Sequence, residues 1–222
     1  MRIFPLSESA LTIEFGNEVS PELNNRAIAL AGHFNQNPFP GLIEAVPAYA
    51  SVTLFYDLLE TRRAFPESDS VFTAISGLAM RAVETISGSA SGGARLIEIP
   101  MNISETDSPD LRSISQRSGL TPDEVIDIFT GRTYRVYMLG FLPGFAYMGE
   151  VDERIAIPRL PTPRTKVPEG SIGIAGRQTG IYPLESPGGW NIVGRTDLLL
   201  FDPQAEEPTL LKPGDEIRFV QR

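Results

Sequence analysis

Apolar and polar positions along the first hundred residues alternate between the spacing of a strand and that of a helix. Residues 10–15 (ALTIEF) place an apolar side chain at every second position, which is typical of a strand with one buried face. Ser20 and Pro21 then provide a helix N-cap and a first-turn proline, so we expect a helix from there to about Gln36. The same reasoning predicts the remaining elements of this part: strands at 44–46, 51–56 and 95–103, and a second helix that begins at Asp69.

The order of these elements, β-α-β-β-α-β, predicts an α+β fold with a ferredoxin-like arrangement in the N-terminal part. The sequence SGSASGG at 87–93 is typical of a flexible linker. We therefore expect an α+β domain at 1–93, a connector made of a strand and helices at 94–132, and a β-barrel domain at 133–222. The barrel is predicted from short, closely spaced strand patterns with turn signals between them, at 134–139, 171–175, 180–182, 190–194, 197–201 and 216–220.

Two short helices are predicted within 108–132, where Gly119 separates them and Thr121 and Glu124 form a capping box for the second. A helix–glycine–helix segment of this size resembles a DNA-reading helix-turn-helix. However, the segment contains three basic and four acidic residues, and the whole chain has a net charge of −9. Such a segment cannot neutralise a phosphate backbone, so we expect a structural insert and no nucleic-acid partner.

Composition narrows the possible chemistry. The chain has 222 residues, 41% of them hydrophobic, and no apolar run approaches the roughly 18 residues of a membrane span. No apolar segment typical of a signal peptide follows the first residues, so we expect a cytoplasmic protein. The absence of cysteine and the presence of one histidine, His33, exclude disulfides, thiolate catalysis and histidine-rich metal sites. His33 is interpreted as a helix-surface residue, so catalysis by this chain alone would require carboxylates, lysine, arginine or backbone groups.

Glycine and proline concentrate between Leu139 and Thr196, a stretch with 10 of the 20 Gly, 7 of the 19 Pro and the only Trp. Because glycine permits positive φ and proline fixes φ, this stretch is predicted to consist of turns and short strands that place side chains rigidly. Six basic and two acidic residues lie between Arg154 and Arg195 in a chain that is acidic elsewhere. This local positive charge suggests a pocket for a small anion or an acidic partner. A barrel whose corners simply require glycine and proline is the structural alternative.

The candidate site residues in this stretch are of two kinds. Donors that could hold a carboxylate or phosphate are Arg164, Lys166, Arg177, Gln178, Thr179, Tyr182 and Arg195. Flat apolar walls for a pocket or a partner groove are Phe141, Phe145, Tyr147 and Trp190. We expect these residues to converge at one end of the barrel, while some of the aromatics could equally be core. The sequence contains no phosphate-loop or dinucleotide-binding motif and no metal-site motif, so no catalytic residue is assigned.

Several long motifs of this stretch closely resemble one family. They are 140–145 (GFLPGF), 163–168 (PRTKVP), 170–176 (GSIGIAG), 178–183 (QTGIYP), 186–190 (SPGGW) and 194–196 (GRT). The family is described as the allophanate hydrolase subunit 1 family, the sporulation kinase-inhibitor (KipI) family, and the family of the B subunit of bacterial 5-oxoprolinase. It corresponds to subdomains C and D of a carboxyltransferase domain. The resemblance covers the whole chain and implies that the C-terminal barrel is cyclophilin-like.

The resemblance also implies a function exerted together with partners. In the 5-oxoprolinase branch, such a chain acts with a subunit 2 (C-type) homologue that has a similar barrel and with an A subunit of the lactam-utilisation type. The complex converts 5-oxo-L-proline to L-glutamate with ATP hydrolysis. We expect this role first, as a subunit that is inactive alone, with ATP bound through the complex and no metal or covalent cofactor in this chain. The alternatives are inhibition of a sensor histidine kinase, and a carboxyltransferase-type role in allophanate hydrolase or urea carboxylase.

Two departures from the family pattern affect these expectations. Asn102, Ile103 and Ser104 stand where the family has a Tyr-Gly-Gly stretch, and Phe129 stands where a histidine is usual. If those positions serve catalysis in the family, this chain would be impaired or would act on a different substrate.

Overall fold

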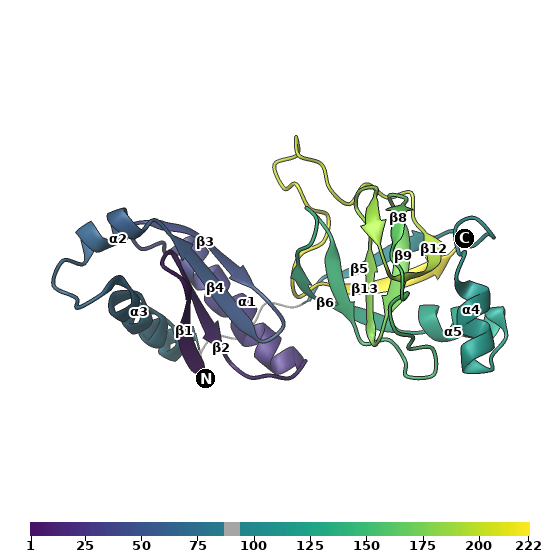
Figure 1. Ribbon diagram of the computed structural model, residues 1–222, viewed down its shortest axis with the longest axis horizontal. Coiled ribbons are helices and arrows are strands. Elements are labelled where there is room, and N and C mark those ends of the chain that lie inside the picture. The colour runs from purple at the N-terminus through teal and green to yellow at the C-terminus, as the bar shows by residue number, and fades with distance from the viewer. Residues whose placement is uncertain (87–93) are drawn as a thin grey trace. The chain divides into compact units, whose positions relative to one another are not determined.

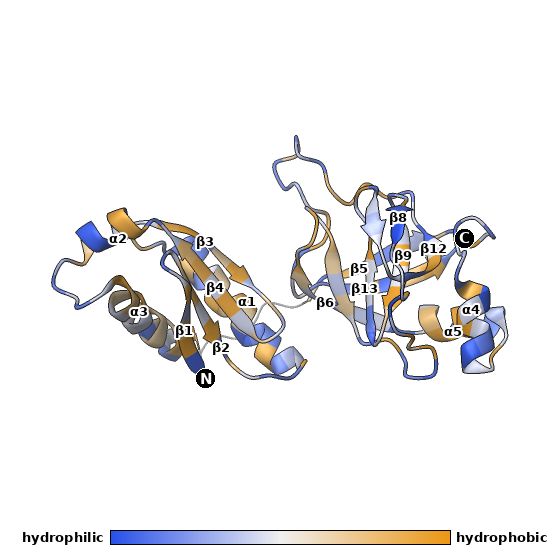
Figure 2. Ribbon diagram, in the orientation of Figure 1, coloured by the Kyte–Doolittle hydropathy of each residue, from blue (hydrophilic) through white to orange (hydrophobic). Residues whose placement is uncertain are grey.

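The computed structural model describes residues 1–86 and 94–222 and divides the chain into two compact units, Met1–Gly93 and Ala94–Arg222 (Figure 1). The predicted linker at 87–93 lies outside the described residues. Each unit has its own hydrophobic core, and apolar residues concentrate on the strands of both units (Figure 2). Within the described residues, no helix has the length and apolar character needed to cross a membrane.

The first unit is a four-stranded antiparallel sheet with two long helices packed against it. Ser20 caps α1 (Pro21–Gln36) by accepting a hydrogen bond from the Leu23 N–H, in agreement with the sequence pattern. The apolar faces of α1 and α3 (Val71–Ile86) share one core with the sheet. The remaining elements of this unit are β1 (Arg2–Ser7), β2 (Ala10–Glu14), β3 (Leu42–Pro47), β4 (Ser51–Tyr56) and the short α2 (Leu58–Ala64).

The strand order in this sheet is β1-β2-β4-β3. It differs from the predicted ferredoxin-like order at the edge beside β2. A ferredoxin-like sheet built from the predicted elements would have the strand at 95–103 beside β2. That edge is occupied instead by β1, which we did not predict and which forms a hairpin with β2. A hairpin closes a much shorter loop than a strand beyond α3 would, so its pairing costs less conformational entropy.

The second unit contains a nearly closed, barrel-like sheet of seven strands in the order β12-β9-β10-β7-β6-β13-β5. Asn102 and Arg195 join its two ends through backbone hydrogen bonds of 2.7 and 3.0 Å. The strands are β5 (Leu96–Met101), β6 (Thr133–Leu139), β7 (Ala146–Gly149), β9 (Ser171–Ala175), β10 (Gln178–Ile181), β12 (Asn191–Arg195) and β13 (Glu216–Gln221). Two further strands, β8 (Arg164–Val167) and β11 (Ser186–Gly188), form a separate small sheet. The structure thereby confirms the predicted α+β class with a C-terminal barrel.

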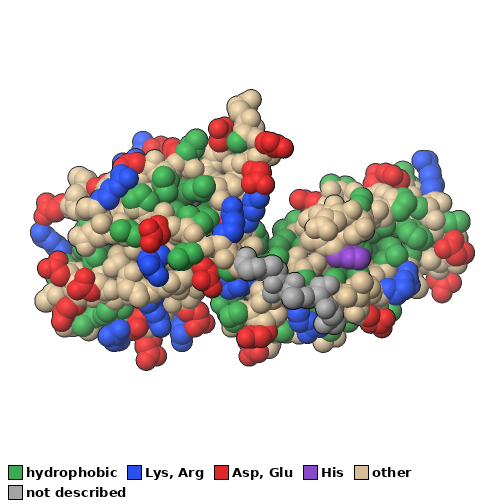
Figure 3. Space-filling view, turned by 180° about the vertical axis from the view of Figure 1, so that it is seen from behind, with side chains coloured by type: hydrophobic (Ala, Val, Ile, Leu, Met, Phe, Trp, Pro, Cys, Tyr) green, Lys and Arg blue, Asp and Glu red, His purple; other side chains and the backbone are tan. Residues whose placement is uncertain are grey.

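Residues 94–132, which we expected to form a connector, are part of this second unit. β5 pairs in parallel with β13, while α4 (Leu111–Ser118) and α5 (Pro122–Thr130) pack on the barrel core. Gly119 ends α4 with a φ of 72°, and α5 begins with the capping box of Thr121 and Glu124. Both helices therefore use their apolar faces for packing. Acidic and basic side chains are interspersed on the face drawn in Figure 3, where no continuous basic area is visible.

The two departures from the family pattern occupy structural positions. Phe129 is fully buried and stacks on Phe219 with ring centroids 5.0 Å apart, and the Tyr134 hydroxyl donates a 2.7 Å hydrogen bond to the Phe129 carbonyl. Asn102 closes the barrel, and its side-chain amide donates to Asp197 at 2.9 Å. In this chain, both positions stabilise the second unit.

Candidate functional site

Five aromatic side chains meet at one end of the barrel and line a pocket of about 230 Å³. They are Phe141, Phe145, Tyr147, Tyr182 and Trp190. Arg159, together with glycines and prolines of the surrounding turns, completes the lining. The structure thus brings the four predicted wall residues together with Tyr182, one of the predicted donors.

Phe145 is the centre of this aromatic cluster. Its ring centroid lies 4.9 Å from that of Tyr147, 5.3 Å from that of Tyr182 and 5.5 Å from that of Trp190, all in edge-to-face geometry. Edge-to-face contacts of this kind stabilise by roughly 0.5–1.5 kcal/mol each beyond the burial of apolar area. Phe145 is only 1% exposed, so it holds the surrounding rings in place from within.

Phe141 lies at the rim of the pocket in a conformation that is unusual for a bulky residue. Its φ is 68°, and the Leu142 N–H donates a 2.8 Å hydrogen bond to the Gly140 carbonyl across it, which defines a γ-turn with positive φ. Its side chain is 61% exposed, although the ring contacts Phe145. A strained backbone that presents an exposed aromatic ring at a pocket is a feature of binding sites.

The close approach of Gly188 keeps Tyr182 in place. A Cβ at position 188 would overlap with the Tyr182 hydroxyl and ring, so this packing requires glycine. Burial raises the pKa of Tyr182 above its ordinary value, partly opposed by a hydrogen bond from the Trp190 backbone. The Tyr182 hydroxyl therefore stays protonated at neutral pH and remains a donor.

The buried tyrosines make the folded state sensitive to alkaline pH. Burial raises the pKa of Tyr56, Tyr134 and Tyr182 above 10.0. In the unfolded chain these hydroxyls ionise near pH 10, so the stability they provide is complete below that pH and is lost as the pH rises toward their folded pKa values. We expect the free energy of unfolding, measured in urea, to be level up to about pH 9 and to fall above about pH 10. The free energy of unfolding of the Tyr182→Phe variant should fall less steeply above that pH than that of the unchanged protein. Equal slopes for the two proteins would contradict the role given to the Tyr182 hydroxyl.

Arg159 is a pocket residue that the sequence pattern did not single out. Its guanidinium carbon lies 5.9 Å from the centroid of the Trp190 ring, and the side chain is exposed. In the part of the chain that the structure describes, Arg159 forms no ion pair with a carboxylate. The neighbouring Leu160 N–H donates a 2.7 Å hydrogen bond to the Gly189 carbonyl, which ties this segment to the pocket rim. Among the described residues, Arg159 is the only one with a charged side chain in the pocket lining.

The predicted cations each have a partner elsewhere on the chain. Their nearest partners are Asp110 for Arg164 (2.6 Å), Glu185 for Lys166 (2.8 Å), Glu150 for Arg177 (2.6 Å) and the Glu169 carbonyl for Arg195 (2.9 Å). Arg164 also approaches the Trp190 carbonyl, at 3.5 Å, but it does not line the pocket. The positive charge of these side chains is therefore directed to partners within the same chain.

Two predicted donors, Gln178 and Thr179, lie away from the pocket. Gln178 begins β10 and pairs with Gly149, whereas Tyr182 follows the opposite end of the same strand. Thr179 is fully buried, and its hydroxyl donates to the Gly173 carbonyl at 2.9 Å. Gln178 and Thr179 belong to the same short motif as Tyr182. In the structure, the length of β10 and the alternation of side chains along it separate them from Tyr182.

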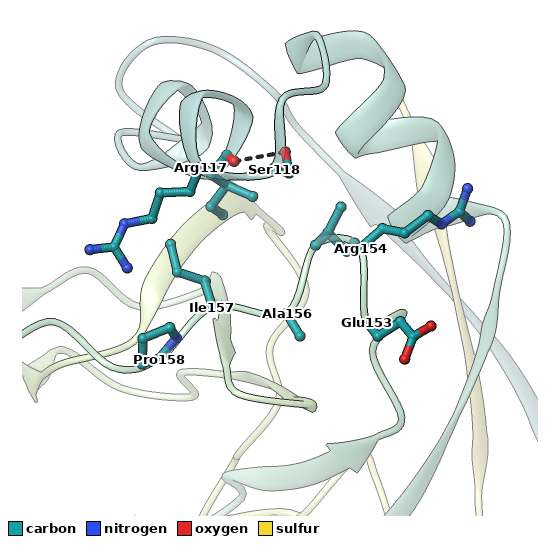
Figure 4. A pocket seen from close by; sticks show the side chains of 9 residues that line it. Arg117, Ser118, Glu153, Arg154, Ala156, Ile157 and Pro158 are labelled. Carbon is teal, nitrogen blue, oxygen red and sulfur yellow. Dashed lines mark hydrogen bonds between the residues drawn. The ribbon is translucent and has the colours of Figure 1, made fainter.

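A second and larger pocket, of about 550 Å³, lies between α4 and residues 153–158 (Figure 4). The side chains of Arg117 and Arg154 extend in opposite directions in this view, so they do not clamp one ligand together. Arg154 pairs with Asp152 at 2.9 Å, and this hydrogen bond holds the pKa of Asp152 well below its ordinary value. One of the two arginines of this pocket is thus already paired with a carboxylate.

The described residues contain no group of three or more histidine, cysteine, aspartate or glutamate side chains that could hold a metal ion. His33 lies half-buried on α1, with its ring edge-to-face against Phe34 at 5.5 Å. Binding by side-chain donors and aromatic faces is the chemistry that the aromatic pocket supports.

Comparisons with known proteins agree with the motifs. A family model described as carboxyltransferase domain, subdomain C and D, matches residues 1–211. The chain is 42% identical over 221 residues to the B subunit of 5-oxoprolinase from Bacillus subtilis (strain 168), which covers 99% of this chain and 92% of that protein. It is 36% identical over 225 residues to the B subunit of 5-oxoprolinase from Escherichia coli O157:H7, covering 99% and 95%.

A solved structure has a similar fold. The crystal structure of TTHA0988 matches with a TM-score of 0.81 and 40% sequence identity over 96% of this chain. The present chain spans only 40% of that longer chain. By its family match and its full-length relatives, this chain belongs to the family of carboxyltransferase-domain subdomains C and D.

Proposed function

We propose that this chain is the B subunit of an ATP-dependent 5-oxoprolinase, which opens the lactam ring of 5-oxo-L-proline to give L-glutamate. The observation that carries this proposal is the match to proteins named as the B subunit of 5-oxoprolinase along nearly the whole length of both chains. The match covers 99% of this chain and 92% of the Bacillus subtilis protein. A full-length match of this kind supports a shared role more strongly than a shared barrel, because one fold hosts many functions.

The proposed role requires partners. A designation as a B subunit indicates further subunits, and we propose a C-type homologue with a similar barrel and an A subunit of the lactam-utilisation type. The greater length of the TTHA0988 chain is compatible with a partner fused to the corresponding region in that protein. In this chain, Arg164, Lys166 and Arg177 already pair with carboxylates, which favours binding of the ATP phosphates by another component of the complex.

The need for ATP follows from the chemistry of the substrate. An amide within a ring resists attack by water because its carbonyl is stabilised by resonance. Transfer of the γ-phosphoryl group of ATP to the lactam oxygen would activate the ring carbon toward water. Addition of one water would break the C–N bond and leave an acyl phosphate, and a second water would hydrolyse that acyl phosphate, so that the products are L-glutamate, ADP and inorganic phosphate. Donors positioned around the substrate lower the cost of this step.

A growth experiment tests the proposal in cells. A Bacillus subtilis strain lacking its own 5-oxoprolinase subunits should grow on 5-oxo-L-proline as nitrogen source when it receives this chain with its cognate A and C subunits. Omitting only this chain should abolish that growth. Growth without this chain would refute the proposal. Inhibition of a sensor kinase by this chain, without any effect on growth, would instead support the kinase-inhibitor alternative.

A further inference from the structure

We propose that the aromatic pocket of the barrel binds the lactam carboxylate itself, with the Arg159 guanidinium on its carboxylate and the aromatic rings around its five-membered ring. This inference rests on the proposed function and deepens it, because it assigns substrate binding to this chain and to named residues. Four properties of the pocket support it: its size, its charge, its walls and its rigidity.

The size of the pocket limits the ligand to a small molecule. Its volume of about 230 Å³ lies below the roughly 300–1,000 Å³ of sites for drug-sized ligands. A nucleotide with its triphosphate does not fit such a volume, whereas a single ring with one substituent does. ATP is therefore not the occupant of this pocket.

The charge of the pocket selects an anion that carries no positive group. Arg159 is the only charged side chain that the described residues contribute to the lining, and it has no carboxylate partner among them. None of the described aspartates or glutamates lines the pocket, so an ammonium group would enter without a counter-charge. A lactam carboxylate meets both conditions, because its carboxylate is anionic and its ring nitrogen is a neutral amide. A cyclic amino acid such as L-proline has the carboxylate but carries a positive charge on its ring nitrogen, so it meets only the first condition.

The walls fit a flat ring with one polar edge. Phe145, Trp190 and the exposed ring of Phe141 offer aromatic surfaces to the apolar carbons. The Tyr182 hydroxyl is protonated at neutral pH and provides a donor for a neutral carbonyl oxygen. The combination of one cation, neutral donors and aromatic walls corresponds to the carboxylate, the lactam carbonyl and the ring of the substrate.

The pocket is rigid before any ligand arrives. The γ-turn fixes Phe141, the glycine at 188 allows Tyr182 its position, and the hydrogen bond from Leu160 to Gly189 holds the segment that carries Arg159. Because these contacts exist within the free chain, little ordering is required on binding, which favours affinity for a small ligand.

The only tryptophan of the chain lies in this pocket, so its fluorescence reports binding directly. We expect a saturable change in Trp190 emission when 5-oxo-L-proline is added to the full chain. L-Proline, with a charged ring nitrogen, and 2-pyrrolidinone, without a carboxylate, should bind at least about tenfold more weakly. Equal affinity for all three compounds would overturn the proposal.

Arg159→Gln is the decisive variant. It should weaken binding of 5-oxo-L-proline by a factor of about ten to a hundred, because one charge-assisted contact is lost at a pre-formed site. Arg154→Gln is the matched control, since Arg154 is an exposed cation paired with Asp152 and does not line this pocket. The Arg154→Gln variant should bind 5-oxo-L-proline with the same affinity as the unchanged protein. Equal losses of affinity in the two variants would contradict the role given to Arg159.

A second measurement separates this proposal from the proposed function. In the complex with the A and C subunits, Arg159→Gln should raise the KM for 5-oxo-L-proline by a similar factor and leave the KM for ATP unchanged. An active complex in which Arg159→Gln alters neither fluorescence titration nor KM would refute the pocket and leave the proposed function standing. Ligand binding to this chain with no lactam hydrolysis by any complex would refute the proposed function and leave the pocket standing.

Discussion

Replacing Phe145 with alanine is expected to lower the free energy of unfolding of the second unit by about 3–5 kcal/mol, as deletion of a buried aromatic ring generally does. Phe145 is 1% exposed and contacts the rings of Tyr147, Tyr182 and Trp190, so its removal leaves a cavity that the rigid turns cannot close. Urea unfolding followed by circular dichroism measures the loss.

Phe141→Ala is the matched control for this change. Phe141 belongs to the same cluster but is 61% exposed, and alanine at φ of 68° is strained no more than phenylalanine. We expect a cost below about 1 kcal/mol, since little apolar area is removed from the core. Because the Phe141 ring forms a pocket wall, this variant should nevertheless bind 5-oxo-L-proline more weakly. Equal destabilisation by both alanine variants would show that the cluster is not organised around Phe145.

Replacing Asp110 with alanine is expected to lower the free energy of unfolding by about 2–4 kcal/mol. The Asp110 carboxylate is buried and accepts two 2.6 Å hydrogen bonds, from the Arg164 guanidinium and from the Ile192 N–H. Its loss leaves a buried N–H without a partner and a partly buried guanidinium without its counter-charge. We expect the Asp110→Ala change to cost less stability than the loss of one partner of a fully buried ion pair, because the Arg164 side chain is 32% exposed and partly solvated.

The exposed ion pair between Arg112 and Glu105 provides the comparison. Both side chains are at least 80% exposed, so Glu105→Ala should change the stability by less than about 1 kcal/mol. Thermal and urea unfolding of the two variants, side by side, measure the difference. A cost for Asp110→Ala as small as that for Glu105→Ala would contradict the role given to the Asp110 carboxylate.

Features that depend on neighbouring residues could be predicted from the sequence. The N-cap at Ser20, the capping box of Thr121 and Glu124, and the helix end at Gly119 lie where the sequence pattern predicted them, because each is decided within one turn of helix. The stretch rich in glycine, proline and aromatic residues contains the residues that line the aromatic pocket. Local chemistry thus identified α1, α4 and α5, whereas the short helix α2 was not predicted.

Features that depend on distant partners could not be predicted in this way. Arg164 is a free cation in the sequence, but folding places Asp110, 54 residues earlier, within 2.6 Å of it. The strand expected at 95–103 pairs with β13 at the end of the chain, and no local pattern specifies that parallel partner. The expected strand at 197–201 is absent apart from an isolated bridge between Phe201 and Thr209. A run of apolar residues alone does not supply the ladder that a strand requires.

Arg159 illustrates the same limit at the site. In the sequence it is one of six basic residues in a charged stretch, and nothing local distinguishes it from Arg164 or Arg177. What distinguishes it is that folding gives the other two a carboxylate and places Arg159 over Trp190 instead. Because the candidate residues were chosen by local positive charge, they include arginines that the fold pairs with carboxylates and omit Arg159, which lines the pocket.

The most direct test of the proposed role is the rate of L-glutamate formation from 5-oxo-L-proline and ATP by the purified components, measured with each one omitted in turn. We expect no turnover by this chain alone, turnover when it is combined with its A and C partners, and loss of that turnover when this chain is left out. Within the active mixture, ADP and glutamate should appear in equal amounts. Full turnover by the A and C partners without this chain, or turnover by this chain alone, would contradict the assignment of this protein as a necessary, non-autonomous subunit.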